Sequence, residues 1–244
     1  MTLYLALAVS GLAAAWLVSR YDLYDREPGP LTAAVIAAGA VAMAMAGPVE
    51  DRAIRLVSGG LPAVAHIAAV AAAVEEGARF AIVLALAWLV PRHFNDPMDG
   101  LIYGSLAGIG MALEETTMYL ARDASAPVTG ALPVEIVRLF GHVIMGGITG
   151  FGIGMIHGDR TWRRWRAIAA ACLVTGVTIH FLWDAVALTN SMHAGWETQA
   201  TAMSLALMVV SMGLYGGLVV AGSRSSRAVF APNSPVRLWR RDLP

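Results

Sequence analysis

The sequence contains no lysine and only one cysteine, Cys172. A single cysteine cannot form an intrachain disulfide, so a disulfide framework is excluded. All 17 basic residues are arginine, and 17 acidic residues balance them. We interpret the missing lysine as the compositional bias of a GC-rich genome. No basic, aromatic-interleaved patch suggests nucleic acid, so no nucleic-acid partner is expected.

Charge of either sign is also scarce. Only 14% of the residues are charged, 57% are hydrophobic, and the mean hydropathy is +0.63. Soluble domains carry about one quarter charged residues. The composition therefore predicts an all-α integral membrane protein. Residues 1–19 have no positive charge ahead of their apolar run, which favours a retained first span over a cleaved signal peptide.

Apolar runs predict about seven transmembrane helices joined by short polar loops. The predicted spans are residues 2–19, 31–49, 63–90, 98–121, 133–157, 167–189 and 200–222. Residues 1–222 then form one polytopic membrane domain. Residues 223–244 are expected to form a basic, flexible cytoplasmic tail that lies along anionic lipid headgroups.

The arginines in the loops predict the orientation of the chain in the cell membrane. Most of them fall on the side of the C-terminus, whereas only Arg52, Arg55 and Arg122 fall on the opposite side. Because positively charged loops stay in the cytoplasm, the N-terminus is predicted to lie outside and the C-terminus inside.

Two adjacent carboxylates, Glu75 and Glu76, interrupt the middle of the third apolar run, and Arg79 follows them. An ionisable residue at the bilayer centre costs on the order of 2.5–3.5 kcal/mol on insertion scales. Such residues face the protein interior or a water-filled cavity, where they have partners. The pair therefore predicts a functional site inside the membrane.

Other spans carry ionisable residues as well: Glu114, Glu115, His142, His180 and Asp184. At about 1.5 Å per residue, the groups from four spans lie at similar depths, displaced toward the outer side. We therefore predict that seven helices surround an intramembrane polar cavity. Glu114 is expected to point elsewhere, because neighbouring residues on a helix diverge by about 100°.

The spacing of these groups favours hydrolytic chemistry. His180 and Asp184 stand one turn apart, the relation that zinc-binding helices use, and His142 and Glu115 supply further donors. Two or three such ligands and a bound water make a hydrolytic metal centre. The candidate ligands of zinc or another divalent metal are Glu76, Glu115, His142, His180 and Asp184.

Structural roles remain as alternatives for some of these residues. For His180 and Asp184 the alternative is a structural hydrogen bond between helices, and for His142 it is a packing role. Three positions are open for Arg138: a pair with Glu135, extension toward the lipid headgroups, or a contact with Asp184. Glycines at four-residue spacing in the fourth and fifth spans predict close helix packing in lipid.

Six short segments occur in a fixed order along most of residues 22–190. They are residues 25–30 (DREPGP), 75–79 (EEGAR), 99–104 (DGLIYG), 110–116 (GMALEET), 141–142 (GH) and 180–184 (HFLWD). In these segments the chain resembles the PrsW family of intramembrane proteases. It departs from the family pattern at Arg79, where Lys is usual, at Met111, where Phe is usual, and at Thr116, where Asn is common. The paired glutamates also resemble the broader CAAX-processing and bacteriocin-processing (CPBP) membrane peptidases.

The resemblance implies proteolysis of a membrane-anchored substrate. In bacterial relatives this is typically a single-pass regulator, such as an anti-sigma factor, cut near its extracytoplasmic side. The residue of the fourth span that matches the family pattern is Glu115. A bacterial cell-membrane protein and a single-pass protein substrate are therefore expected.

The predicted catalytic residues are Glu75, Glu76, His142 and His180. We expect one of the glutamates to deprotonate a water that attacks the scissile carbonyl. The histidines, with Asp184 and Glu115, either bind a metal ion or orient the water and stabilise the oxyanion. The main alternative is a proton- or metal-ion-coupled transporter, although no internal repeat is evident. A non-catalytic scaffold is the third.

Overall fold

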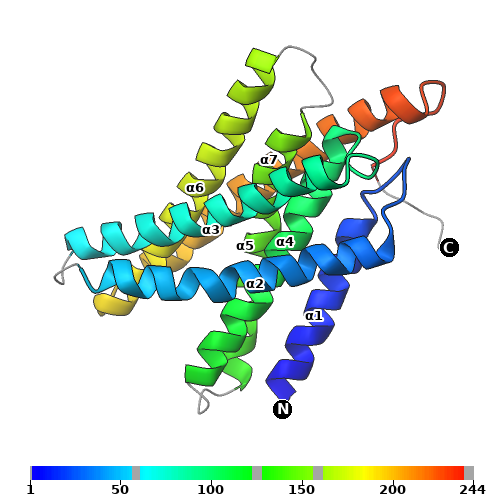
Figure 1. The fold of residues 1–244 in the computed structure, drawn as a ribbon. Coiled ribbons are helices and arrows are strands. Elements are labelled where there is room, and N and C mark those ends of the chain that lie inside the picture. The colour runs from blue at the N-terminus through cyan, green and yellow to red at the C-terminus, as the bar shows by residue number, and fades with distance from the viewer. Residues whose placement is uncertain (1, 57–60, 123–127, 156–161, 239–244) are drawn as a thin grey trace.

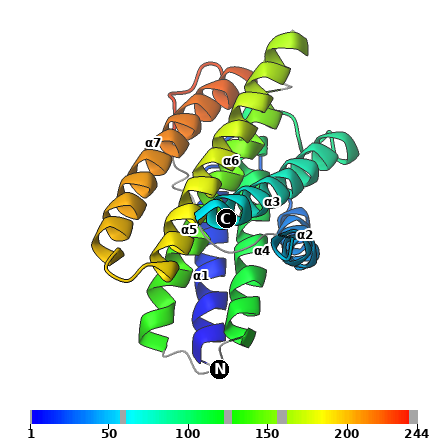
Figure 2. The same cartoon turned by 90° about the vertical axis from the view of Figure 1, so that its left-hand side faces the viewer.

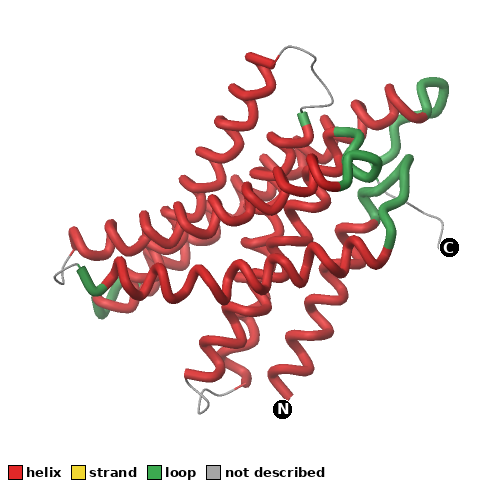
Figure 3. Tube along the Cα trace, viewed as in Figure 1, coloured by secondary structure: helices red, strands yellow, loops and turns green. Residues whose placement is uncertain are grey.

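The computed structural model describes residues 2–56, 61–122, 128–155 and 162–238. Within these ranges all regular structure is helical, as the tube in Figure 3 shows. The helices follow the order of the predicted spans (Figure 1). They are α1 (Thr2–Ser19), α2 (Gly29–Ile54), α3 (Leu61–Leu89), α4 (Pro97–Arg122), α5 (Val128–Gly154), α6 (Trp162–Met192) and α7 (Glu197–Phe230).

Among the residues that the structure describes, four helices are long and apolar enough to cross a membrane. They are α2, the part of α5 from Val134 onward, the part of α6 from Trp165 onward, and α7, while Leu3–Ser19 is a shorter apolar helix. Helix α3 is continuous, but charged residues interrupt its apolar sequence, and α4 begins and ends with polar residues. The all-helical membrane fold is thus confirmed, and the count of seven spans remains a prediction.

Helices α4 and α5 form the centre of the bundle. Glycines at four-residue spacing face one another across their interface, and a Cβ on Gly104 would collide with the carbonyl oxygen of Gly146. A Cβ on Gly100 would likewise meet the backbone of Gly150. Small residues let helices approach at backbone distance where lipid provides no hydrophobic drive. The predicted glycine packing is confirmed.

Helices α2 and α3 lie side by side and run across the group formed by α1, α4 and α5, as the two views in Figures 1 and 2 show. Helix α2 packs on α4 through Gly39, whose Cβ position is filled by the backbone of Ala107. Helices α6 and α7 cover the other side of α5 (Figure 2). The site described below is found among α2, α3, α4, α5 and α6.

Two helices extend beyond their apolar runs. Helix α2 continues through Pro48 to Ile54, and α7 continues past residue 222 to Phe230. Hydropathy marks the part of a helix that faces lipid or core, so a polar helical end is not recognised by it. In the expected tail, residues 231–238 turn back on α7, where Arg227 Nη1 donates a hydrogen bond of 3.0 Å to the Ser234 carbonyl.

A buried acidic network lies around the loop that joins α1 to α2. Tyr103 of α4 donates a hydrogen bond to the Glu27 carboxyl, and the Glu27 amide donates to Asp22 Oδ2 at 2.7 Å. Burial raises the pKa of Glu27 to about 7, against the lowering effect of the Tyr103 hydrogen bond, and the charge of Asp22 adds to the increase. The network ties this loop to the central helix.

Candidate active site

Helix α3 brings both glutamates into the protein interior but gives them different surroundings. Glu75 is 3% exposed and lines a cavity, whereas Glu76 is 0% exposed and does not reach the cavity. Adjacent helical residues diverge by about 100°, which accounts for the difference. Arg79, one turn later, is also fully buried. Its Nη2 lies 3.3 Å from Glu75 Oε2, and its Nη1 forms an ion pair with Glu76 Oε1.

Glu76 is held by three helices. Besides Arg79, it accepts a 2.9 Å hydrogen bond from Thr149 Oγ1 of α5 at its Oε2 atom. Its Oε1 atom lies 3.1 Å from His180 Nδ1 of α6. A carboxylate can only accept hydrogen bonds, so the Nδ1 atom of His180 carries the hydrogen. Glu76 thus fixes the orientation of the His180 ring.

His142 of α5 is held in one tautomer by its neighbours. Arg79 Nη2 donates a hydrogen bond to Nδ1 of His142, and a guanidinium has no acceptor atom. The imidazole hydrogen therefore lies on Nε2, which is 2.9 Å from Glu115 Oε2 of α4. The ring is 5.8 Å from that of His180, measured between centroids.

The Nε2 atom of His180 faces the cavity. It lies 3.8 Å from Glu75 Oε1 and 3.4 Å from Asp184 Oδ2. The structure thus brings together Glu75, Glu76, Glu115, His142, His180 and Asp184, which come from four helices, as the sequence predicted. His180 and Asp184, one helical turn apart, are thus in contact. The His180 ring lies near three carboxylates, those of Glu75, Glu76 and Asp184.

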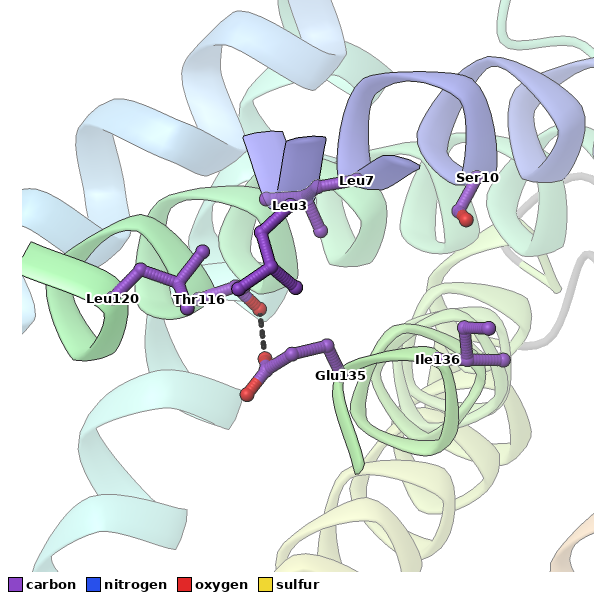
Figure 4. A pocket seen from close by; sticks show the side chains of 7 residues that line it. All are labelled: Leu3, Leu7, Ser10, Thr116, Leu120, Glu135 and Ile136. Atoms are coloured by element: carbon purple, nitrogen blue, oxygen red, sulfur yellow. Dashed lines mark hydrogen bonds between the residues drawn. The ribbon is translucent and has the colours of Figure 1, made fainter. Parts of the chain in front are cut away.

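Arg138 of α5 connects two glutamates at one side of the site. Its Nε lies 3.4 Å from Glu115 Oε1, and its Nη1 pairs with Glu135 Oε2. Of the three predicted positions for Arg138, the pair with Glu135 is confirmed. Thr116, which stands where the family commonly has Asn, donates a 2.5 Å hydrogen bond to Glu135, drawn as a dashed line in Figure 4. The hydroxyl therefore supports Arg138 through Glu135.

The cavity has a volume of about 230 Å³ and lies among five helices. Its polar lining comprises Glu50, Asp51, Glu75, Glu115, Tyr119, Arg138, His142, His180 and Asp184. Trp183 and the apolar residues of α2 and α6 complete it, and Glu114 is not part of it. A mixed polar cavity within an apolar bundle is the expected form of an intramembrane hydrolytic site.

Glu50 and Thr149 are among the residues of this site that the sequence did not identify. Glu50 was expected in a loop after the second span, yet it belongs to the last turns of α2 and lines the cavity. Thr149 lies among the glycines of α5, where a single hydroxyl gives no pattern. Only the contact with Glu76 shows its role.

One group of donors in the described residues fits a metal ion. Glu75, Glu115 and His142 each offer one ligand atom, and these atoms lie within 4.8 Å of one another. Carboxylate and imidazole donors are those of hydrolytic zinc sites, and three protein ligands leave a position for water. The sequence had proposed Glu76 in place of Glu75, together with His180 and Asp184. Glu76 is instead engaged with Arg79 and Thr149.

Residues 27–219 match the model of the PrsW family of intramembrane metalloproteases. The matched range includes every residue of the cavity and covers well over half of the chain. The chain belongs to the PrsW family. No match was found among curated proteins or among solved structures.

Membership of the PrsW family makes the protein an intramembrane protease and implies a membrane-protein substrate and a metal ion. It supports the protease prediction over the transporter alternative. In this PrsW-family protein, the donor group Glu75, Glu115 and His142 is the part of the site that fits the metal.

Proposed function

We propose that the protein is an endopeptidase that cuts single-pass membrane proteins, with Glu75 as the base that activates water. The observation that carries this proposal is the convergence of Glu75, His142 and His180 on one buried cavity, each in a fixed orientation. Glu75 is favoured over Glu76 because its carboxylate lines the cavity. Glu76 is occupied by Arg79, Thr149 and His180.

In the proposed reaction a water lies between Glu75 and the scissile carbonyl. Glu75 accepts a proton as the water oxygen attacks the carbonyl carbon, and the proton then passes to the leaving amide nitrogen as the C–N bond breaks. The products are a carboxylate and an amine. The Nε2–H of His142 supplies a hydrogen-bond donor for the oxyanion, whereas the Nε2 atom of His180 carries no hydrogen and accepts a hydrogen bond from the attacking water.

A divalent ion, zinc or another, would be held by Glu115, His142 and one oxygen of Glu75, which leaves the other Glu75 oxygen to accept the proton, and the ion would polarise the carbonyl and acidify the water. Arg79 now contacts both Glu75 and the Nδ1 atom of His142. The guanidinium and the ion would therefore compete for the same donors. Glu76, His180 and Asp184 keep their positions outside this group and orient the substrate and water.

We further propose that all seven helices cross the bacterial cell membrane, with the N-terminus outside and the C-terminal segment from residue 223 on in the cytoplasm. Under this arrangement the site is offset toward the outer leaflet. Glu75 and His142 lie near the middle of α3 and α5, whereas Glu115 and Asp184 lie toward the outer ends of α4 and α6. A single-pass protein would then be cut near its extracytoplasmic side.

Cleavage by the purified protein in lipid nanodiscs tests this function. Single-pass proteins with an outer juxtamembrane segment serve as substrates, and mass spectrometry locates the cut. We expect wild-type protein to cleave at least one of them, with loss of activity on chelation and recovery on adding Zn²⁺. His180→Ala should be inactive while retaining its elution volume at the assay temperature. Equal cleavage by wild type and His180→Ala would contradict the proposal.

A further inference from the structure

Glu50 of α2 is a carboxylate in the cavity that the proposed chemistry does not use. Its Oε1 atom is buried and has no hydrogen-bond partner among the described residues. The side chain lines the cavity from the α2 wall, whereas Asp184 lines it from the α6 wall. A buried carboxylate oxygen without a donor is costly, and its presence points to a partner that arrives with the substrate.

The basic groups of the site are already engaged elsewhere. Arg79 pairs with Glu75 and Glu76, and Arg138 pairs with Glu115 and Glu135. Arg52 and Arg55 follow Glu50 by two and five residues at the end of α2, and both are exposed. Residues at these spacings do not lie on the same face of a helix, so neither arginine shares the face of Glu50.

The charges around Glu50 add to the attraction for a cation. Glu115 and Asp184 are close enough to act electrostatically on its carboxylate, and both carry negative charge in the ionised form. The cavity lining contains five acidic residues against Arg138 and two histidines. An anionic cavity with low-dielectric walls concentrates positive charge inside it.

Glu50 and Asp184 line the cavity from two helices that do not contact each other. Both α2 and α6 line the cavity, but no Cα atom of α2 lies within 8 Å of a Cα atom of α6. One face of α2 lines the cavity, because its lining residues recur at three- to four-residue spacing: Met43, Gly47, Glu50 and Ile54. A substrate segment that reaches Glu75 along this face passes Glu50.

We propose that Glu50 binds an arginine or lysine side chain of the substrate close to the peptide bond that is cut. This inference rests on the proposed protease function, because it names the substrate feature that the same cavity selects. An ammonium or guanidinium group would satisfy the buried Oε1 atom by a charge-assisted hydrogen bond. Glu50 is thus a specificity residue, separate from the groups that act on the scissile bond.

Cleavage of matched probes tests this selection. The probes are single-pass peptides in nanodiscs that differ only by Arg, Gln or Glu at one position, scanned across the juxtamembrane segment. For wild type we expect kcat/KM to be about tenfold or more higher for the best Arg probe than for its Gln counterpart. Glu50→Gln should bring this ratio close to one, and Glu50→Arg should shift the preference to the Glu probe. Glu197→Gln, an exposed site on α7, should keep the wild-type ratio.

Binding measured without catalysis separates this inference from the proposed function. In a Glu75→Gln background, Kd for the Arg probe should be about tenfold lower than for the Gln probe, and adding Glu50→Gln should remove the difference. If wild type cleaves no probe but this binding preference is found, the protease proposal fails and the selection by Glu50 stands. Cleavage without an Arg preference, or a preference unchanged in Glu50→Gln, overturns the selection. Loss of a bound divalent ion in Glu50→Gln, with equal affinity for both probes, would also overturn it.

Discussion

The two adjacent glutamates should respond differently to the same conservative substitution. In Glu76→Gln, Arg79 loses its close partner and His180 loses a charged acceptor, all within a fully buried contact set. Removing one partner of a buried ion pair costs about 3–5 kcal/mol. In Glu75→Gln, Arg79 keeps Glu76, and the contacts that are weakened are longer: 3.3 Å to Arg79, 3.8 Å to His180 and 3.9 Å to His142. We expect a loss of about 1 kcal/mol there.

For catalysis, the substitution at Glu75 should cause the larger loss of the two. Removing a general base typically lowers the rate about 10²- to 10⁴-fold, which is about 3–5 kcal/mol of barrier at 1.36 kcal/mol per tenfold. Glu75→Gln should therefore be well folded and almost inactive. Glu76→Gln should be destabilised, and its remaining activity should depend on the folded fraction.

Two assays on the same samples decide the matter. Unfolding in mixed detergent micelles gives the free energy of unfolding, and cleavage of a single-pass substrate gives kcat. If Glu76→Gln is as stable as wild type, or if Glu75→Gln keeps more than about one tenth of the wild-type kcat, the assignment of roles is wrong.

Three further predictions concern the fold, the metal and pH. Gly104→Leu should lower the free energy of unfolding by about 3 kcal/mol, because its side chain collides with the Gly146 backbone, whereas Gly216→Ala meets nothing within 4 Å and should be neutral. Arg79→Met should tighten Zn²⁺ binding, measured by calorimetry, because a competing cation is removed; unchanged affinity would contradict the donor assignment. The folded protein retains the Glu27 proton up to a pKa of about 7, whereas the unfolded chain releases it near 4.5, so stability should fall between these pH values. Melting temperatures of wild type and Glu27→Gln from pH 4.5 to 8 should show this slope in wild type, reduced in the variant; equal slopes would refute it.

Much of the helical framework was predictable because apolar runs are long and distinct in this chain. The glycine spacing of α4 and α5 also predicted their contact, since small residues at four-residue intervals form one flat face. The ends of α2 and α7 were missed, because polar residues there continue the helix beyond the apolar surface. Glu50 was missed for the same reason.

Within the site, the sequence could predict which groups share a depth but not how they pair. That Glu75 and Glu76 diverge follows from helix geometry, whereas which of them faces the cavity depends on how α3 is rotated against α5 and α6. The tautomer of His142 is set by its contact with Arg79, a residue of another helix that lies 63 positions away in the sequence. Three positions were plausible for Arg138, and only the packing of α5 on α4 selects among them.

The most direct test of the account is hydrolysis in ¹⁸O-enriched water by the purified protein in a lipid nanodisc. We predict that a single-pass protein is cut into two fragments, with one ¹⁸O atom in the new C-terminal carboxylate, and that Glu75→Gln forms no labelled product. Labelled product from Glu75→Gln at the wild-type rate would contradict the account. Failure of folded, metal-loaded wild-type protein to cut any of a range of single-pass substrates would contradict it as well.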